Sequence, residues 1–236
     1  MTWILALALS AELDAATVRA DDPVLYDSLI TLQPTMTRAG FPRFSHPDLA
    51  QEGAAEVFAV RLQEGGEAIE VRAALASTLA YSADPDLLLQ LIDQEEDPLV
   101  RMHLLAGLEK LEPDLALPVL TAGLRDSSVG IRVESARVLS LREDCALAAP
   151  ELIAALSDPE PEVRAMAARA LGWHHIEEGF DPLLPLLSDV DTKVRLQAVR
   201  SLGRIDAERA GPLVAPLVDD ADPNVARKAA SIAGSP

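Results

Sequence analysis

The sequence predicts an all-α protein, built as a solenoid of about six stacked helix pairs with an atypical N-terminal cap. First, the segments VRAMAARALG and VRLQAVRSLG, which begin at Val163 and Val194, share their start, apolar spacing and final glycine. A fixed period of about 20 to 50 residues is typical of stacked repeats. Second, 49% of the residues are hydrophobic but only 3% are aromatic, a composition that suits packed helices. Third, segments such as ELIAALS place apolar residues at helical spacing.

The Val-Arg pair gives the register of the repeats. Arginine follows a β-branched apolar residue in five successive repeats, at Arg72, Arg101, Arg132, Arg164 and Arg195; that residue is valine in four of them and Ile131 in the third. The spacings between these arginines are 29, 31, 32 and 31 residues, and Val225-Ala226 continues the series after another 31. Each repeat is therefore expected to contain this segment as its second helix.

The start of the chain does not follow the repeat. Residues 1–11 are apolar from Trp3 to Leu9, which is too short for a membrane span. They fit either the core of a secretory signal or the start of a capping helix, although no Lys or Arg precedes them. Export to the periplasm or the medium is favoured over a cytoplasmic location. We predict a cap over residues 12–47 and the repeats over residues 48–236, with no transmembrane segment.

Each repeat is expected to consist of a first helix, a turn and a second helix. In one repeat, residues 181–188 form the apolar first helix, DVDT is the turn, and the second helix starts at Lys193. Asp158-Pro159 and Asp222-Pro223 are expected to start second helices, because aspartate accepts from free amides and proline needs no partner. Glycines that can take a left-handed conformation are expected to end these helices, at Gly172, Gly203 and Gly234.

The segment DPEPEVRAMAARALG, from Asp158 to Gly172, resembles the HEAT repeat in its short bacterial, phycobilisome-lyase-like form. The resemblance covers about residues 48–236 and implies a right-handed superhelix with the second helices on its concave side. It also implies a ladder between repeats, made by an aspartate and an arginine six positions apart. These pairs are Asp126 with Arg132, Asp158 with Arg164, and Asp189 with Arg195. Because Gly66 and Ala226 interrupt the pattern, the ladder should fade towards both ends.

Positions that the core does not need are candidates for binding a partner. Counted from the ladder arginine as zero, Ala or Leu recurs at positions three, four and seven, so positions one, two, five and nine point away from the core. Position five is arginine in three successive repeats. The predicted partner-binding residues are Arg137, Arg169, Arg200, Arg204, Trp173, Met166, Tyr81, His103 and Glu134.

These arginines would form a continuous basic line on an acidic protein. Such a line could hold an acidic peptide, a phosphorylated segment or a carboxylated ligand, with Trp173 as an apolar anchor. The alternative is that each arginine pairs with a neighbouring Glu or Asp and only keeps the face hydrated. The sequence leaves both interpretations open.

Several functional classes are disfavoured. The formal net charge of −18 argues against a nucleic-acid partner. Cys145 cannot form an internal disulfide and is expected to be a small residue of an inter-repeat loop. The adjacent His174 and His175 lack the spacing of an H-E-x-x-H zinc helix, so no metal or cofactor is predicted. The di-iron enzymes with HEAT-like repeats have His-Glu pairs after the arginine, which this chain lacks, and no G-x-S-x-G, P-loop or Cys-x-x-Cys motif is present.

The sequence therefore predicts a non-catalytic scaffold or adaptor that binds another protein or peptide, acidic or mixed apolar and acidic, on the concave face. The resemblance alone implies an alternative, a ligand-handling lyase or chaperone subunit of the phycobilin-lyase type. In that case Trp173, Arg169 and Arg200 would suit a pigment. The identity of the partner and the oligomeric state stay open.

Overall fold

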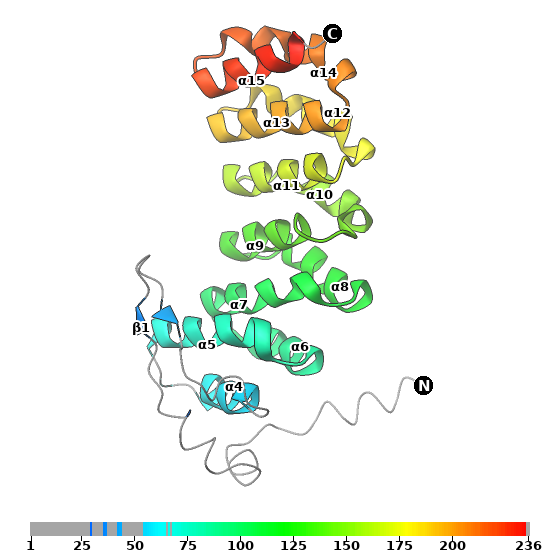
Figure 1. The fold of residues 1–236 in the computed structure, drawn as a ribbon. Helices are drawn as coiled ribbons and strands as arrows, with labels where there is room; N and C mark the ends of the chain where they lie inside the picture. The colour runs from blue at the N-terminus through cyan, green and yellow to red at the C-terminus, as the bar shows by residue number, and fades with distance from the viewer. Residues whose placement is uncertain are drawn as a thin grey trace. The chain divides into compact units, whose positions relative to one another are not determined.

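The computed structural model describes residues 29, 35–36, 42–43, 54–64, 66 and 68–234 (Figure 1). The expectations for residues 1–11, and for all but five of residues 12–47, lie outside this description. The chain divides into two compact parts, an N-terminal part, Met1–Leu108, and a C-terminal part, Glu109–Pro236. None of the described helices is both long and apolar enough to span a bilayer.

In the N-terminal part, helices follow a short antiparallel pair of strands, β1 (Thr35–Met36) and β2 (Pro42–Arg43). The described helices there are α4 (Ala54–Glu64), α5 (Ile69–Ser82), α6 (Pro85–Gln94) and α7 (Pro98–Leu105). Asp84 and Asp97 accept from the first free amides of α6 and α7, each directly before a proline. Helices α5 and α7 pack together, and their inward side chains, such as Leu79 and Leu104, are fully buried.

The C-terminal part consists of helix pairs. Its α-helices are α8 (Pro113–Gly123), α9 (Val129–Leu139), α10 (Ala149–Ala155), α11 (Pro161–Trp173), α12 (Phe180–Leu183), α13 (Thr192–Ile205), α14 (Ala207–Val214) and α15 (Pro223–Ala233). The second helices α9, α11, α13 and α15 are stacked in sequence order, with the first helices beside them (Figure 1). First helices are short: α12 and α14 continue as the 3-10 helices Leu184–Ser188 and Ala215–Asp219. The prediction of stacked helix pairs is confirmed.

The core of the C-terminal part follows the predicted positions. The side chains at positions three, four and seven of α11 and α13 have no exposed surface, and they are Ala167, Ala168, Leu171, Ala198, Val199 and Leu202. Small alanines at two of these three places in α11 allow neighbouring helices to approach closely. Positions one, two, five and nine of the same two helices are half-buried or exposed.

The prediction that glycines end the second helices in a left-handed conformation is wrong. Gly172 and Gly203 lie inside α11 and α13, and Gly234 follows α15 with φ of −92°. Among the described residues, only His175 and Gly66 have positive φ, at 52° and 76°. The first two glycines instead allow close packing, because a Cβ at Gly172 would lie 2.3 Å from Cβ of Ser201 on the next second helix.

One predicted helix start is also shifted. Helix α11 begins at Pro161 after Glu160, so Asp158-Pro159 precedes it by a turn. A carboxylate oxygen of Asp158 accepts the backbone amide of Glu160, at 2.9 Å, instead of capping the helix. Asp222 does cap α15, where it accepts from the amides of Asn224 and Val225.

Candidate functional site

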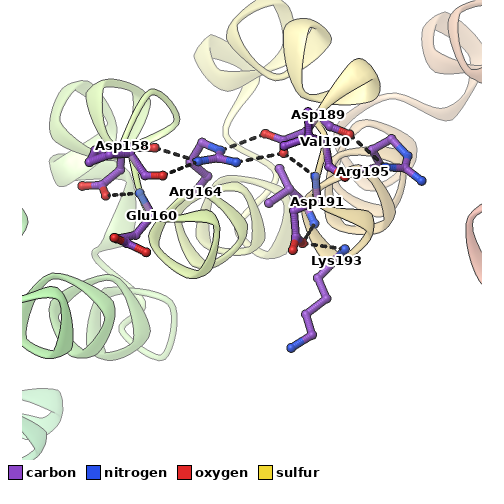
Figure 2. A network of polar contacts seen from close by, with 10 residues as sticks. Asp158, Glu160, Arg164, Asp189, Val190, Asp191, Lys193 and Arg195 are labelled. Carbon is purple, nitrogen blue, oxygen red and sulfur yellow. Dashed lines mark hydrogen bonds and ion pairs between the residues drawn. The ribbon is translucent and has the colours of Figure 1, made fainter.

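A ladder of arginine and aspartate side chains connects successive repeats (Figure 2). Arg164 donates from Nε and Nη2 to the two carboxylate oxygens of Asp189 in the following repeat, each at 2.8 Å. Its Nη1 donates to the backbone oxygens of Asp158 and Pro159 in its own repeat, at 2.9 and 3.0 Å. The arginine therefore ties the turn before its own helix to the turn of the next repeat.

The same arrangement recurs on both sides of this rung. Arg132 bonds to the carboxylate of Asp158 and to the backbone oxygen of Asp126, and Arg195 bonds to Asp220 and to the backbone oxygen of Asp189. All six predicted ladder residues thus take part, but each side-chain ion pair joins two repeats. Within one repeat the contact between arginine and aspartate runs through the aspartate backbone.

The prediction that the ladder fades towards both ends is wrong. In the N-terminal part, Nη2 of Arg72 donates to both carboxylate oxygens of Glu95 at 2.8 Å. Glu95 stands six positions before Arg101, where the repeats of the C-terminal part have aspartate. At the other end Asp220 accepts from Arg195 although its own repeat has Ala226 in place of an arginine. A search for either acidic residue at this position would have found Glu95.

Two ladder carboxylates, those of Asp189 and Asp220, have a lowered pKa and are held in their ionised form. Burial opposes ionisation of Asp189, but hydrogen bonds from Arg164 and from the Asp191 amide, with the charges of Arg164 and Arg195, lower its pKa from 3.8. The hydrogen bond from Arg195, followed by one from the Asp222 amide, lowers the pKa of Asp220 in the same direction. The side chains of Asp189 and Asp220 are only 8% and 7% exposed, so water screens these interactions little.

Acid should therefore weaken the fold through the ladder. A carboxylate whose pKa is lower in the folded than in the unfolded chain stabilises the fold at every pH above the unfolded value of about 3.9. This contribution is lost as the pH falls from there through the folded pKa. Urea unfolding between about pH 2.5 and 7 should show this loss below about pH 4. The double variant Asp189→Asn with Asp220→Asn should be less stable than the wild type at neutral pH, and its free energy of unfolding should fall less in acid. If the free energy of unfolding fell equally in the variant and the wild type, these two carboxylates would not be the source of the acid effect.

Three exposed arginines and a tryptophan lie together on α11 and α13. We call Arg169, Arg200 and Arg204 the basic cluster. Cζ of Arg204 lies 4.8 Å from the ring centroid of Trp173, in a cation–π contact, and Trp173 is 54% exposed. Arg200 stands one turn before Arg204 on α13, and Arg169 one turn before Trp173 on α11. These four side chains thus occupy two neighbouring helices in the same register.

The charges of the basic cluster are not balanced by carboxylates. Within the part of the chain that the structure describes, none of the three arginine side chains has an ion pair or a hydrogen bond. Burial lowers the pKa of Arg204 below its ordinary value, and the charges of Arg200 and Arg169 lower it further. The guanidinium groups therefore repel each other, and the cluster is suited to an anion.

The line of arginines predicted from the sequence is interrupted at α9. Nε and Nη2 of Arg137 each donate at 2.7 Å to the carboxylate of Glu134, one turn earlier. Both are predicted partner-binding residues, and together they form a neutral pair. On α15, position five is Ser231 rather than an arginine. The uncompensated charge at position five is confined to α11 and α13.

The remaining predicted residues lie in two places. Met166 is half-buried on α11, one turn before Arg169. Tyr81 and His103 belong to the N-terminal part: Tyr81 is 62% exposed near the end of α5, and Nδ1 of His103 lies 3.0 Å from Oγ of Ser77. Tyr81 and His103 thus belong to a different part of the chain from the basic cluster.

Two positively charged side chains on α15 were not among the residues predicted from the sequence. Arg227 and Lys228 occupy positions one and two, counted from Ala226. Arg227 is exposed and donates to the side chain of Asn224 at 2.8 Å, and Lys228 is half-buried. Val225-Ala226 continues the register, so applying positions one and two to this repeat as well would have found them.

His174 and His175 each contact a neighbouring repeat through a backbone oxygen. Nε2 of His174 donates to the backbone oxygen of Ser140 after α9, at 3.0 Å, and Nδ1 of His175 donates to that of Arg204 on α13, at 2.6 Å. His175 adopts its positive φ to make this contact. No group of three His, Cys, Asp or Glu side chains among the described residues is placed to hold a metal ion.

Cys145 is a buried thiol within the loop between α9 and α10, in a short 3-10 helix, Cys145–Ala148. Burial, together with the neighbouring charge of Asp144, raises its pKa to about 12. The thiol is therefore neutral at physiological pH and lies buried in the loop.

Stacked helix pairs, a repeated inter-repeat ladder and a surface of exposed second-helix positions define a helical-repeat scaffold. The model of HEAT repeats matches residues 56–141 and 149–233, well over half of the chain. The chain belongs to the HEAT-repeat family, as its resemblance predicted. No curated protein matches its sequence.

Solved structures of similar fold are helical-repeat proteins. The complex of CpcE and CpcF of phycocyanin lyase from Nostoc sp. PCC7120 matches with a TM-score of 0.57 and 22% identity, over 84% of this chain and 80% of that chain. A computationally designed armadillo repeat protein for modular peptide recognition matches with a TM-score of 0.56 and 20% identity, over 75% of this chain and 97% of that chain. A designed armadillo repeat protein in complex with the peptide (KR)4 matches with a TM-score of 0.55 and 18% identity, over 74% of this chain and 96% of that chain. At these identities the likeness concerns the fold alone.

Proposed function

We propose that the protein is a non-catalytic scaffold or adaptor that binds an acidic segment of a partner protein on the exposed face of α11 and α13. The observation that carries this proposal is the basic cluster, which has no carboxylate partner among the described residues and lies beside the exposed Trp173. An acidic ligand would relieve the repulsion among the guanidinium groups. Trp173 would then supply the apolar contact that anchors such a ligand.

The charge of the whole protein makes the cluster selective. At a net charge of −18, long-range attraction of an anionic partner is weak, so binding must come from contacts within about 10 Å. Directional guanidinium–carboxylate hydrogen bonds act at that range. We therefore expect a partner that carries its negative charge next to an apolar residue, rather than any polyanion.

The absence of catalysis is part of the proposal. The thiol of Cys145 is neutral and buried, and the rings of His174 and His175 each donate to a backbone oxygen. These residues are thereby engaged in packing and in contacts between repeats. This arrangement supports a binding role over a hydrolytic one.

The test is a charge reversal on the proposed face. Arg169→Glu with Arg200→Glu should weaken binding of fluorescein-labelled Glu- and Leu-containing peptides by at least about tenfold, measured by fluorescence polarisation. Neither side chain has a partner among the described residues, so circular dichroism and the melting temperature should stay unchanged.

The matched control is Arg125→Glu with Arg209→Glu, which changes the net charge equally. Arg125 follows α8 and makes one ion pair, which is of little energetic weight at its exposed position. Arg209 lies on α14, makes two exposed ion pairs and also lies 3.9 Å from the ring centroid of Phe180, so the melting temperature of the control is measured beside its binding. The control should bind the acidic peptides like the wild type. Equal loss in both double variants, or no loss in the first, would refute the proposed face.

A second candidate is a pigment-handling role. It draws on the likeness in fold to the phycocyanin lyase complex and on the exposed Trp173 beside uncompensated arginines. A linear tetrapyrrole with two propionates would place its apolar rings on Trp173 and its carboxylates on Arg169 and Arg200. Saturable absorbance changes on titration with such a pigment, lost in Trp173→Ala, would favour this candidate; no spectral change would exclude it.

A further inference from the structure

We propose that the basic cluster is a site for a phosphoryl group, so that the partner segment is recognised through a phosphorylated side chain. This inference rests on the proposed function and specifies its ligand. It is drawn from how compact the uncompensated charge is, from the number of donors, and from the way Trp173 and His175 hold Arg204.

The uncompensated charge is concentrated rather than spread along the repeats. Arg137 is neutralised by Glu134, and Ser231 stands at the corresponding position of α15. An extended acidic peptide would gain most from a charge on every repeat, because second helices stack about 10 Å apart. Three guanidinium groups on two adjacent helices suit one compact anion of higher charge.

The number of donors favours a phosphate monoester over a carboxylate. Each guanidinium offers up to five N–H groups, and none of those of Arg169, Arg200 or Arg204 meets an acceptor in the described part of the chain. A carboxylate has one charge and two oxygens, whereas a phosphorylated side chain carries about −1.5 to −2 charges and three acceptor oxygens at pH 7. The dianion would therefore engage three arginines at once and cancel most of their mutual repulsion.

Arg204 is held in place before any ligand binds. Its guanidinium lies over the ring of Trp173, and its backbone oxygen accepts from His175 at 2.6 Å. The fixed end of α13 reduces the entropy that the arginine loses on binding. The exposed part of the Trp173 ring then offers an apolar surface to the side chain that carries the phosphate.

The experiment uses the full chain with Trp3→Phe, which leaves Trp173 as its single tryptophan. The probes are phenyl phosphate and phenylacetate, which share a ring but differ in the anion, at about pH 7.5, where the monoester is a dianion. Binding is followed by tryptophan fluorescence, because an anion at Arg204 alters the environment of the Trp173 ring. We expect phenyl phosphate to bind at least about tenfold more tightly than phenylacetate.

The control variant is Arg169→Gln with Arg200→Gln, which keeps side chains of similar polarity but removes two charges. It should lose at least about tenfold in affinity for phenyl phosphate while its circular dichroism is unchanged. Equal binding of the two probes, or equal binding of phenyl phosphate to wild type and variant, would overturn the phosphoryl site.

A third arm separates this inference from the proposed function. In one outcome, a Glu- and Leu-containing peptide binds the wild type but not the charge-reversed variant, and phenyl phosphate binds no better than phenylacetate. The proposed face is then correct and the phosphoryl assignment is wrong. If neither the peptide nor phenyl phosphate binds the wild type, the proposed function and the phosphoryl site are both rejected.

Discussion

Asp189→Ala should lower the free energy of unfolding by about 3 kcal/mol, the lower end of what is lost when one partner of a buried ion pair is removed. Two guanidinium nitrogens of Arg164 would lose their acceptor, and the amide of Asp191 would lose the carboxylate oxygen 2.8 Å away. The Arg164 side chain is only 13% exposed, so water replaces these bonds poorly. Urea unfolding at neutral pH measures the loss.

Asp191→Ala is the matched control for this prediction. Asp191 stands two residues further along the same turn, and its side chain caps α13 by accepting from the amides of Lys193 and Val194. Loss of a cap costs about 1 kcal/mol, so the control should be clearly milder. A double-mutant cycle with Arg164→Ala should show strong coupling to Asp189 and only weak coupling to Asp191, whose charge acts on Arg164 without a hydrogen bond. Equal losses in both single variants would remove the special role of the ladder.

Gly172→Ala should destabilise the protein by about 1–3 kcal/mol, although alanine is the better helix former by about 1 kcal/mol. A Cβ at this position would lie 2.3 Å from Cβ and Oγ of Ser201 and 2.4 Å from its Cα. The last of these is a backbone atom, so α13 would have to move away from α11. Thermal unfolding followed by circular dichroism measures the effect.

Gly211→Ala should have the opposite sign. Gly211 lies inside α14, and an added Cβ would meet nothing closer than the backbone oxygen of Ile232 at 3.6 Å. The gain in helix propensity, up to about 1 kcal/mol, should therefore appear as increased stability. If both alanine variants shift the melting temperature in the same direction, close helix packing is not what requires glycine at position 172.

Regular features of the fold could be predicted because they depend on local spacing. Buried Ala167, Ala168 and Leu171 follow from the apolar period of one helix alone. The role of Gly172 could not be deduced this way, since it depends on how close Ser201 lies in the next repeat. From the sequence, a glycine near the end of a helix has two physical explanations, and the choice between them requires the neighbouring helix.

The candidate site was predictable to a similar degree. Position five identified Arg169 and Arg200 as outward-facing, and both are exposed. The neutralisation of Arg137 could have been anticipated, because Glu134 stands three residues earlier and such pairs meet on a helix surface. The positive φ of His175 and its contact with a backbone oxygen 29 residues further along the chain could not, because both depend on the neighbouring repeat.

The ladder also has a consequence for how the chain can gain or lose length. Between repeats, each arginine bonds to a carboxylate at the start of the following turn, and Arg132, Arg164 and Arg195 all use Nε and Nη2 for it. An excision of residues 158–188 would bring Asp189 to the place that Asp158 now occupies, and Arg132 would again find an acceptor. Deletion of one whole repeat, from one ladder aspartate to the residue before the next, leaves every ladder arginine with an acceptor, whereas a deletion of another length does not. Duplication or deletion of the corresponding gene segments can therefore change the number of repeats one at a time without breaking the ladder.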